Sequence, residues 1–252
     1  AQLGPEAGVL VVRKGVNFVR QEPHADAAVF SELEAMPKDT QALRPGGIVY
    51  NKTARYNNTM GDYSQEPDIQ KGKGTVLDFA DWPATGALRS SLSSLLGGID
   101  LVGETNFYHN VDQCGIRFHG DAERKIVIGT RFGPRADGFP LKFVWYEHGH
   151  PVGFEGHIEL KEGDLYIMSS KAVGFDKWAT LRLMHTAGKE KYTINPKDLR
   201  PGQSFPPVLS LRMPWTEWAK GRLPKNGPMD AFLSKRKLIE RGGDGDDNAD
   251  PV

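Results

Sequence analysis

The sequence predicts a mainly β protein with flanking helices, an α+β fold whose strands form a double-stranded β-helix, or jelly roll. Short apolar runs follow one another closely between residues 105 and 188, with Gly, Pro and Asp turn signals between them. The clearest helical patterns lie outside this region. At 252 residues with 38% hydrophobic and 10% aromatic side chains, the chain can bury a large core.

We expect four segments along the chain. They are N-terminal strands and a helix at 1–45, the jelly-roll core at 46–192, a C-terminal extension with a helix at 193–241, and a disordered acidic tail at 242–252.

The elements follow from local patterns. Apolar runs predict strands at Val9 to Arg13, Val16 to Val19, Leu141 to Glu147, Val152 to Leu160, Leu165 to Met168, Thr180 to Ala187 and Val208 to Arg212. Helical spacing predicts helices at Asp26 to Met36, with Asp26 as N-cap, at Ala84 to Leu96, with leucines at 88, 92 and 95, and at Pro228 to Arg241.

Composition limits the function classes. Lys and Arg total 32, as do Asp and Glu, so the net charge gives no general case for nucleic-acid binding. The single cysteine, Cys114, excludes an internal disulfide framework and predicts an intracellular, reducing compartment. No apolar run approaches the roughly 18 residues of a membrane span. The sequence does not predict the oligomeric state.

The most informative stretch contains His119-Gly120-Asp121. Side chains two apart on a strand project from one face, so an imidazole and a carboxylate would lie together. They are two thirds of the facial triad that binds non-haem Fe(II). We expect this strand to turn at Asp121 to Lys125 and to return as a hairpin through Ile126 to Ile128.

Asn106 and Tyr108 precede this pair, and Gly163-Asp164 leads into a later apolar strand. With these features the chain resembles the AlkB-like branch of the Fe(II)/2-oxoglutarate dioxygenases over roughly residues 46 to 188. The resemblance implies that His119 and Asp121 bind Fe(II), and that Asn106 and Tyr108 contact 2-oxoglutarate.

The chain departs from this family at two places. The family's distal histidine would fall near Lys177 to Ala179, where there is none, and His185 takes the position of a family arginine. Either His185 is the third iron ligand, which we favour, or the metal site is incomplete. The resemblance also implies that the late strand, Thr180 to Ala187, runs beside the H-x-D segment. The far carboxylate of 2-oxoglutarate needs a cation, ideally a guanidinium, and Arg117 and Arg182 are the candidates.

A second stretch, Ile48 to Tyr63, holds the place of the family's substrate lid. Its Tyr50, Lys52, Arg55 and Tyr56 combine aromatic faces with basic groups, as base stacking and phosphate contact require. An ordinary polar hairpin would look similar.

The expected function is therefore an Fe(II)- and 2-oxoglutarate-dependent oxygenase that uses O₂ to hydroxylate or oxidatively demethylate a substrate, with nucleic acid as a candidate. Two alternatives stay open. One is a catalytically inactive jelly-roll binding or scaffold protein that has lost part of the iron site, and the other is an oxygenase acting on a protein or a small molecule.

Overall fold

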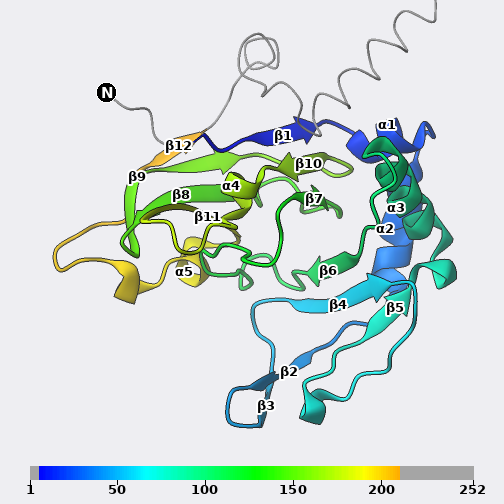
Figure 1. Cartoon of the computed structure of the whole chain (residues 1–252), viewed down its shortest axis with the longest axis horizontal. Helices are drawn as coiled ribbons and strands as arrows, with labels where there is room; N and C mark the ends of the chain where they lie inside the picture. Colours follow the sequence, from blue (N-terminus) through cyan, green and yellow to red (C-terminus); the bar gives the residue numbers. More distant parts are fainter. Residues whose placement is uncertain (1–5, 211–252) are drawn as a thin grey trace, which may run out of the picture. The chain divides into compact units, whose positions relative to one another are not determined.

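The computed structural model describes residues 6–210. Of these, residues 6–88 and 102–210 belong to one compact unit and residues 89–101 to a second. The described chain is mainly β with few helices, which confirms the predicted β-rich α+β class (Figure 1). None of its helices combines the length and the apolar character that crossing a bilayer requires. The predicted helix at Pro228 to Arg241 and the predicted tail at 242–252 lie outside the described residues.

Two sheets form the centre of the first unit. The three-stranded sheet has the order β1-β10-β7 and is antiparallel throughout. The four-stranded sheet has the order β11-β8-β9-β12, with β12 parallel to β9. The strands are β1 (Val9–Val12), β7 (Val127–Thr130), β8 (Leu141–Glu147), β9 (His150–Ile158), β10 (Leu165–Met168), β11 (Leu181–Ala187) and β12 (Val208–Ser210). Since β1 pairs with β10, the segment 1–45 contributes a strand to the same sheet as the core.

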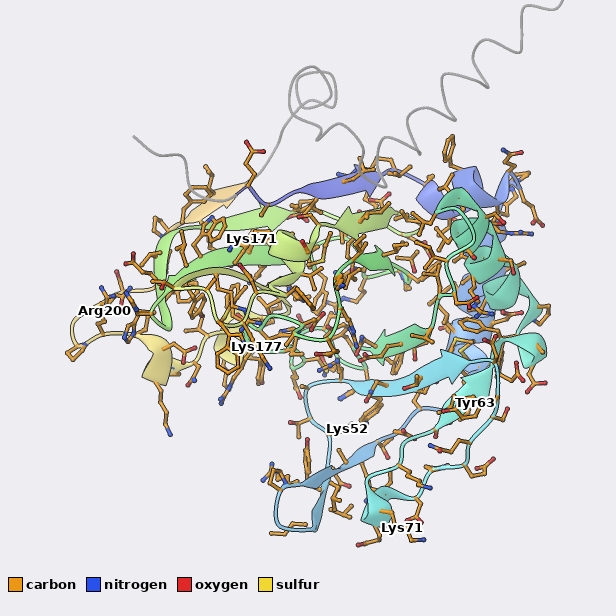
Figure 2. The ribbon with its side chains drawn as sticks, in the orientation of Figure 1. Lys52, Tyr63, Lys71, Lys171, Lys177 and Arg200 are labelled. Carbon is orange, nitrogen blue, oxygen red and sulfur yellow. The ribbon has the colours of Figure 1, made fainter. Side chains whose placement is uncertain are left out.

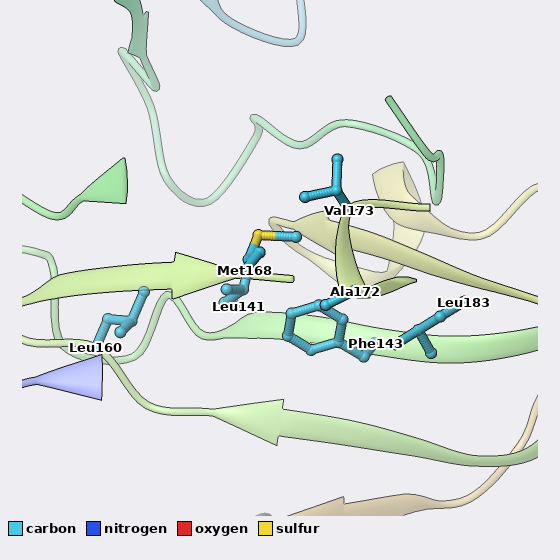
Figure 3. Packing of buried hydrophobic residues seen from close by; sticks show 7 residues of the cluster. All are labelled: Leu141, Phe143, Leu160, Met168, Ala172, Val173 and Leu183. Carbon is cyan, nitrogen blue, oxygen red and sulfur yellow. The ribbon is translucent and has the colours of Figure 1, made fainter. Parts of the chain in front are cut away.

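An apolar cluster joins the two sheets. Leu141 and Phe143 of β8 and Leu183 of β11 contribute to it from one sheet, and Met168 of β10 from the other (Figure 3). The alternate residues of β8, Val144 and Tyr146, pack with Phe118 in another cluster. Because β8 is covered on both faces, it is apolar almost throughout rather than at every second residue.

The turn between β8 and β9 shows how local sequence sets one hairpin. His148 and Gly149 both have a positive φ, 50° and 83°. Two successive left-handed residues suit the right-handed twist of a tight hairpin. The two predicted strands pair with each other, with Glu147 opposite His150.

Two smaller sheets contain the stretch expected to form a lid. A three-stranded sheet has the order β5-β4-β6, and a hairpin joins β2 to β3. The strands are β2 (Gln41–Arg44), β3 (Ile48–Asn51), β4 (Tyr56–Gly61), β5 (Val76–Asp78) and β6 (Gly103–Phe107). Asn57 of β4 lies opposite Asn106 of β6. This pairing brings the stretch Ile48 to Tyr63 beside the Asn106-x-Tyr108 segment.

The helices are α1 (Gly15–Arg20), α2 (Ala25–Ala35), α3 (Pro83–Leu95), α4 (Ser170–Val173) and α5 (Glu190–Thr193). The strand predicted at Val16 to Val19 is therefore wrong, because these residues form α1. A strand would place Val16 and Phe18 on one face, whereas Val16 is 0% exposed and Phe18 is 50% exposed. The predicted helices at Asp26 to Met36 and Ala84 to Leu96 are confirmed as α2 and α3.

The predicted N-cap of α2 is wrong. His24 precedes the helix in a left-handed conformation, with φ of 67°, and Asp26 lies inside the first turn. The carboxylate of Asp26 accepts from Lys14 Nζ at 3.0 Å, and its backbone N–H donates to Asn17 Oδ1 at 2.8 Å. Asp26 therefore ties α2 to α1, a tertiary role that capping patterns do not predict.

The hairpin expected after the His119-Asp121 pair is also wrong. β7 pairs with β10, and residues 116–118 form no strand. Two isolated bridges form here: Gly115 pairs with Gly188, directly after β11, and His119 pairs with His185 of β11. Phe118 N donates to Thr193 O at 3.1 Å and Asp121 N to Val173 O at 2.9 Å. Because these backbone groups bond to three separate segments, a regular ladder cannot form here.

Candidate metal centre

The structure brings His119, Asp121 and His185 together. His119 and His185 face each other across an antiparallel bridge. His119 N donates to His185 O at 3.1 Å, and His185 N donates to His119 O at 2.9 Å. His119 Nε2 lies 3.7 Å from Asp121 Oδ1, and His185 Nε2 lies 3.8 Å from Asp121 Oδ2. One potential ligand atom from each of the three residues lies within 4.8 Å of the others. The expected position of the late strand beside the H-x-D segment is thus observed.

The tautomer of His119 follows from its backbone contact. Its Nδ1 lies 2.8 Å from the carbonyl oxygen of Arg117. A carbonyl oxygen only accepts, so the neutral ring carries its proton on Nδ1. The lone pair is then on Nε2, the atom that faces Asp121. A backbone carbonyl holding the far nitrogen in this way is typical of histidines that bind metals.

His185 is held neutral by its surroundings. Burial, together with the smaller effect of the positive charges of His119, Arg124 and Arg182, lowers the pKa of its imidazole to about 3. A neutral imidazole keeps the lone pair that a metal needs. Its Nδ1 is buried and has no hydrogen-bond partner within residues 6–210.

We expect His185 to stay neutral in the metal-free protein as the pH falls from 6.5 toward about 3. Because its pKa is lower in the folded chain, the unfolded chain takes up the proton first. The His185 contribution to stability is thus complete above pH 6.5 and is lost as the pH falls through this window. Histidine-ring NMR and urea midpoints against pH would check this, with His185→Gln giving a shallower dependence. Titration of this ring near its ordinary pKa would contradict the expectation.

An ion pair with Arg124 orients the carboxylate of Asp121. Arg124 Nη1 lies 3.5 Å from Asp121 Oδ2, and Arg124 also bonds to Glu104. With the Asp121 backbone N–H bonded to Val173 O, both ends of the residue are restrained. Glu104 and Arg124 thus fix the carboxylate from the side of β6, a support that the sequence analysis did not identify.

The donor set fits a divalent transition metal. Two imidazoles and one carboxylate are the facial triad of non-haem Fe(II) sites. Ligand atoms about 2.1 Å from a metal, on adjacent octahedral corners, would lie about 3 Å apart. The distances of 3.7 and 3.8 Å are too long for hydrogen bonds between the imidazoles and Asp121, so only a small closing movement would bring the three ligand atoms to that spacing.

Among known proteins, the chain is similar to an uncharacterized protein of Acanthamoeba polyphaga mimivirus. The two are 40% identical over 190 residues, which cover 74% of this chain and 72% of the viral protein. This chain belongs to the family of that viral protein. No family model matches the chain. Since the viral protein is described only as uncharacterized, membership of its family assigns no activity to this chain.

The residues predicted to contact 2-oxoglutarate lie in different surroundings. Tyr108 packs on Phe139, with ring centroids 4.7 Å apart, while Asn106 Oδ1 accepts from Arg55 Nε. Arg182 donates through Nε and Nη2 to Gly174 O at 2.9 and 2.6 Å. Arg117 is exposed. The role of each of these residues stays a prediction, and the bonds of Arg182 leave less of its guanidinium for a carboxylate.

The predicted substrate residues lie on the smaller sheets. Arg44 covers the ring of Tyr50 at 4.2 Å, and the ring of Tyr56 stacks on His109 at 4.3 Å. Lys52, beside the connection from β3 to β4 (Figure 2), donates to Asn57 Oδ1 at 2.5 Å.

Arg55 lies in the same stretch. It bonds to Asn106 and pairs with Glu104 at 3.8 Å. The charged groups of Lys52 and Arg55 thus have partners within the chain, and binding of nucleic acid by these residues stays a prediction.

Arg131, which follows β7 directly, was not identified from the sequence. Its Nε is buried without a hydrogen-bond partner among the described residues. The available signal was a basic residue at the end of an apolar strand, Ile126 to Thr130, inside the predicted core. That signal is weak, because strand ends commonly carry exposed basic residues.

Proposed function

We propose that this protein is an Fe(II)- and 2-oxoglutarate-dependent oxygenase of the AlkB-like kind, and that its two facing sheets form a double-stranded β-helix. The observation that carries the proposal is the convergence of His119, Asp121 and His185, with both histidine Nε2 atoms turned toward the carboxylate. The bridge between His119 and His185 supports it, because it joins the H-x-D segment to the late strand.

Each residue of this cluster has a definable task. His119, with its tautomer set by Arg117 O, and the neutral His185 would each offer a nitrogen lone pair, while Asp121 would offer a carboxylate oxygen. A triad on one face leaves the remaining positions for a co-substrate. Bound Fe(II) and 2-oxoglutarate would supply the activation of O₂ that oxidises a substrate C–H bond. The protein's part is geometry and the exclusion of water.

The proposed reaction is hydroxylation or oxidative demethylation, with a nucleobase as one candidate substrate. Tyr50 and Tyr56 support that candidate through their aromatic faces. The pairing of Lys52 and Arg55 within the chain does not favour it. Proteins and small molecules are thus equally compatible substrates.

Turnover of 2-oxoglutarate without a substrate tests the proposal. We expect the purified protein, supplied with Fe(II), ascorbate and O₂, to convert 2-oxoglutarate slowly to succinate and CO₂, and we expect His185→Gln to abolish this. Glutamine is chosen because it approximates the size of the buried imidazole. The measurement is succinate formed with time.

His148→Asn is the matched control, because His148 is exposed at a turn whose φ of 50° asparagine tolerates. Its turnover should equal that of the parent. A parent that neither binds Fe(II) nor consumes 2-oxoglutarate would refute the proposal and support the inactive scaffold.

A further inference from the structure

Asp121 lies at one end of a row of four side chains with alternating charge. Arg124 Nη1 lies 3.5 Å from Asp121 Oδ2, and the same guanidinium donates through Nη2 to Glu104 Oε2. The other oxygen of Glu104, Oε1, lies 3.8 Å from Arg55 Nη2. The row therefore runs from the metal centre to the residue that directly precedes β4.

The strands β4 and β6 hold two members of this row in place. Glu104 and Asn106 are two apart on β6, so their side chains project from the same face. Asn106 Oδ1 accepts from Arg55 Nε, which keeps Arg55 beside Glu104. β4 pairs with β6 along this segment, with Asn57 opposite Asn106. Glu104 is thus fixed with one oxygen toward Arg55 and the other toward Arg124.

Arg124 is held unequally by its acidic neighbours. It forms a hydrogen bond with Glu104, whereas its contact of 3.5 Å with Asp121 is longer than hydrogen bonds usually are. A third carboxylate, that of Glu123, lies 4.0 Å from Arg124 Nε, and this side chain is 73% exposed, so water screens the attraction. Glu104 is therefore the main partner of the guanidinium, and the carboxylate of Asp121 keeps lone pairs for another cation.

A divalent metal and Arg124 would compete for that carboxylate. Both are cations, so each is attracted by Asp121 and they repel each other at close range. The Asp121 side chain is only 12% exposed, so water screens these interactions less than at the surface. If Glu104 lost its negative charge, the guanidinium would be free to close on Asp121 and to take the oxygens that a metal needs.

We propose that Glu104 is a positioning residue of the metal centre, which holds Arg124 back from Asp121 and so keeps this carboxylate available to a divalent metal. The inference rests on the proposed function, since it needs a metal at this centre. It deepens that function by naming a residue on a separate sheet that sets the metal affinity. Glu104 acts on Asp121 through Arg124, and Arg55 supports it by orienting its carboxylate.

A double-mutant cycle on Glu104 and Arg124, with Fe(II) affinity measured by anaerobic calorimetry, tests this role. We expect Glu104→Gln to bind Fe(II) about 10-fold more weakly than the parent, because Arg124 then pairs with Asp121. In a protein that already carries Arg124→Gln, the same change should alter the affinity by less than about twofold, since the cation that Glu104 restrains is gone. A purely structural role of Glu104 would instead lower the affinity by the same factor in both backgrounds.

Glu22→Gln is the matched control, because Glu22 also pairs with an arginine, Arg20, at 3.2 Å, but lies between α1 and α2. Its Fe(II) affinity should equal that of the parent. Urea midpoints show whether each variant is folded. If Glu104→Gln does not fold, Arg55→Gln takes its place, with an expected loss of about two- to fivefold that also disappears in the Arg124→Gln background.

Equal losses of Fe(II) affinity with Arg124 present and absent would overturn the positioning role. Unchanged affinity in both Glu104→Gln and Arg55→Gln would overturn it as well. In either case a parent that binds Fe(II) leaves the metal centre itself standing. A parent that binds no Fe(II) would instead overturn the proposed function, and this inference with it.

Discussion

Replacing His119, Asp121 or His185 with alanine is expected to lower the affinity for Fe(II) by roughly 100-fold or more in each case. Loss of a residue that merely supports a metal ligand commonly costs about 10- to 100-fold, so loss of a ligand should cost at least as much. The three residues form one unit, with His119 Nε2 and His185 Nε2 at 3.7 and 3.8 Å from the carboxylate oxygens of Asp121. Anaerobic titration with Fe(II) measures the effect directly.

A loss of Fe(II) affinity is informative only if the variant still folds. Near-ultraviolet circular dichroism of each variant checks the packing, and His185→Gln replaces the alanine variant if the buried site collapses. The exposed histidine variant His148→Asn should bind Fe(II) like the parent. If His185→Ala retained the parent's affinity while His119→Ala lost it, His185 would not be the third ligand and the site would be incomplete.

Gly120→Ala is expected to damage both stability and metal binding, although it adds only one methyl group between the two candidate ligands His119 and Asp121. A Cβ at Gly120 would lie 2.7 Å from the carbonyl oxygen of Gly174 and 2.4 Å from Arg182 Nη2. Those two atoms already form a hydrogen bond, so neither can retreat without breaking it. Overpacking of this kind costs roughly 1–3 kcal/mol, and the movement would also displace the adjacent Asp121. Urea unfolding and Fe(II) titration report the two effects.

Gly61→Ala is the matched control for this substitution. Its Cβ would meet only side-chain atoms at 3.7 to 3.9 Å, which is ordinary contact. We expect its Fe(II) affinity to equal that of the parent. If Gly120→Ala behaved like Gly61→Ala in both assays, the close approach of the H-x-D segment to Gly174 and Arg182 would not be important for the site.

The sequence by itself predicted elements whose cause is local. Alternation and turn residues located β8 and β9, and the leucine spacing located α3, because neighbouring residues alone set these patterns. The predicted approach of the late strand to the H-x-D pair was also observed. It followed from the family resemblance rather than from the spacing of any residues.

The predictions from the sequence were wrong where contacts with residues far away along the chain determine the local structure. Val16 to Val19 is a good strand former by composition, yet it is helical because Val16 is completely buried while Phe18 faces outward. Residues 116–118 were expected to form a regular strand, but their backbone groups bond to separate segments. In both cases tertiary contacts outweigh a weak local preference.

The same division applies to the candidate site. The sequence placed His119 beside Asp121, because side chains two apart on extended backbone share a face. Only the tertiary structure decided that Arg117 O sets the tautomer of His119 and that burial keeps His185 neutral. Only the tertiary structure showed that Arg131 Nε is buried without a hydrogen-bond partner among residues 6–210. Burial and unpaired charge depend on which distant segments pack together, and no spacing along a single chain contains that information.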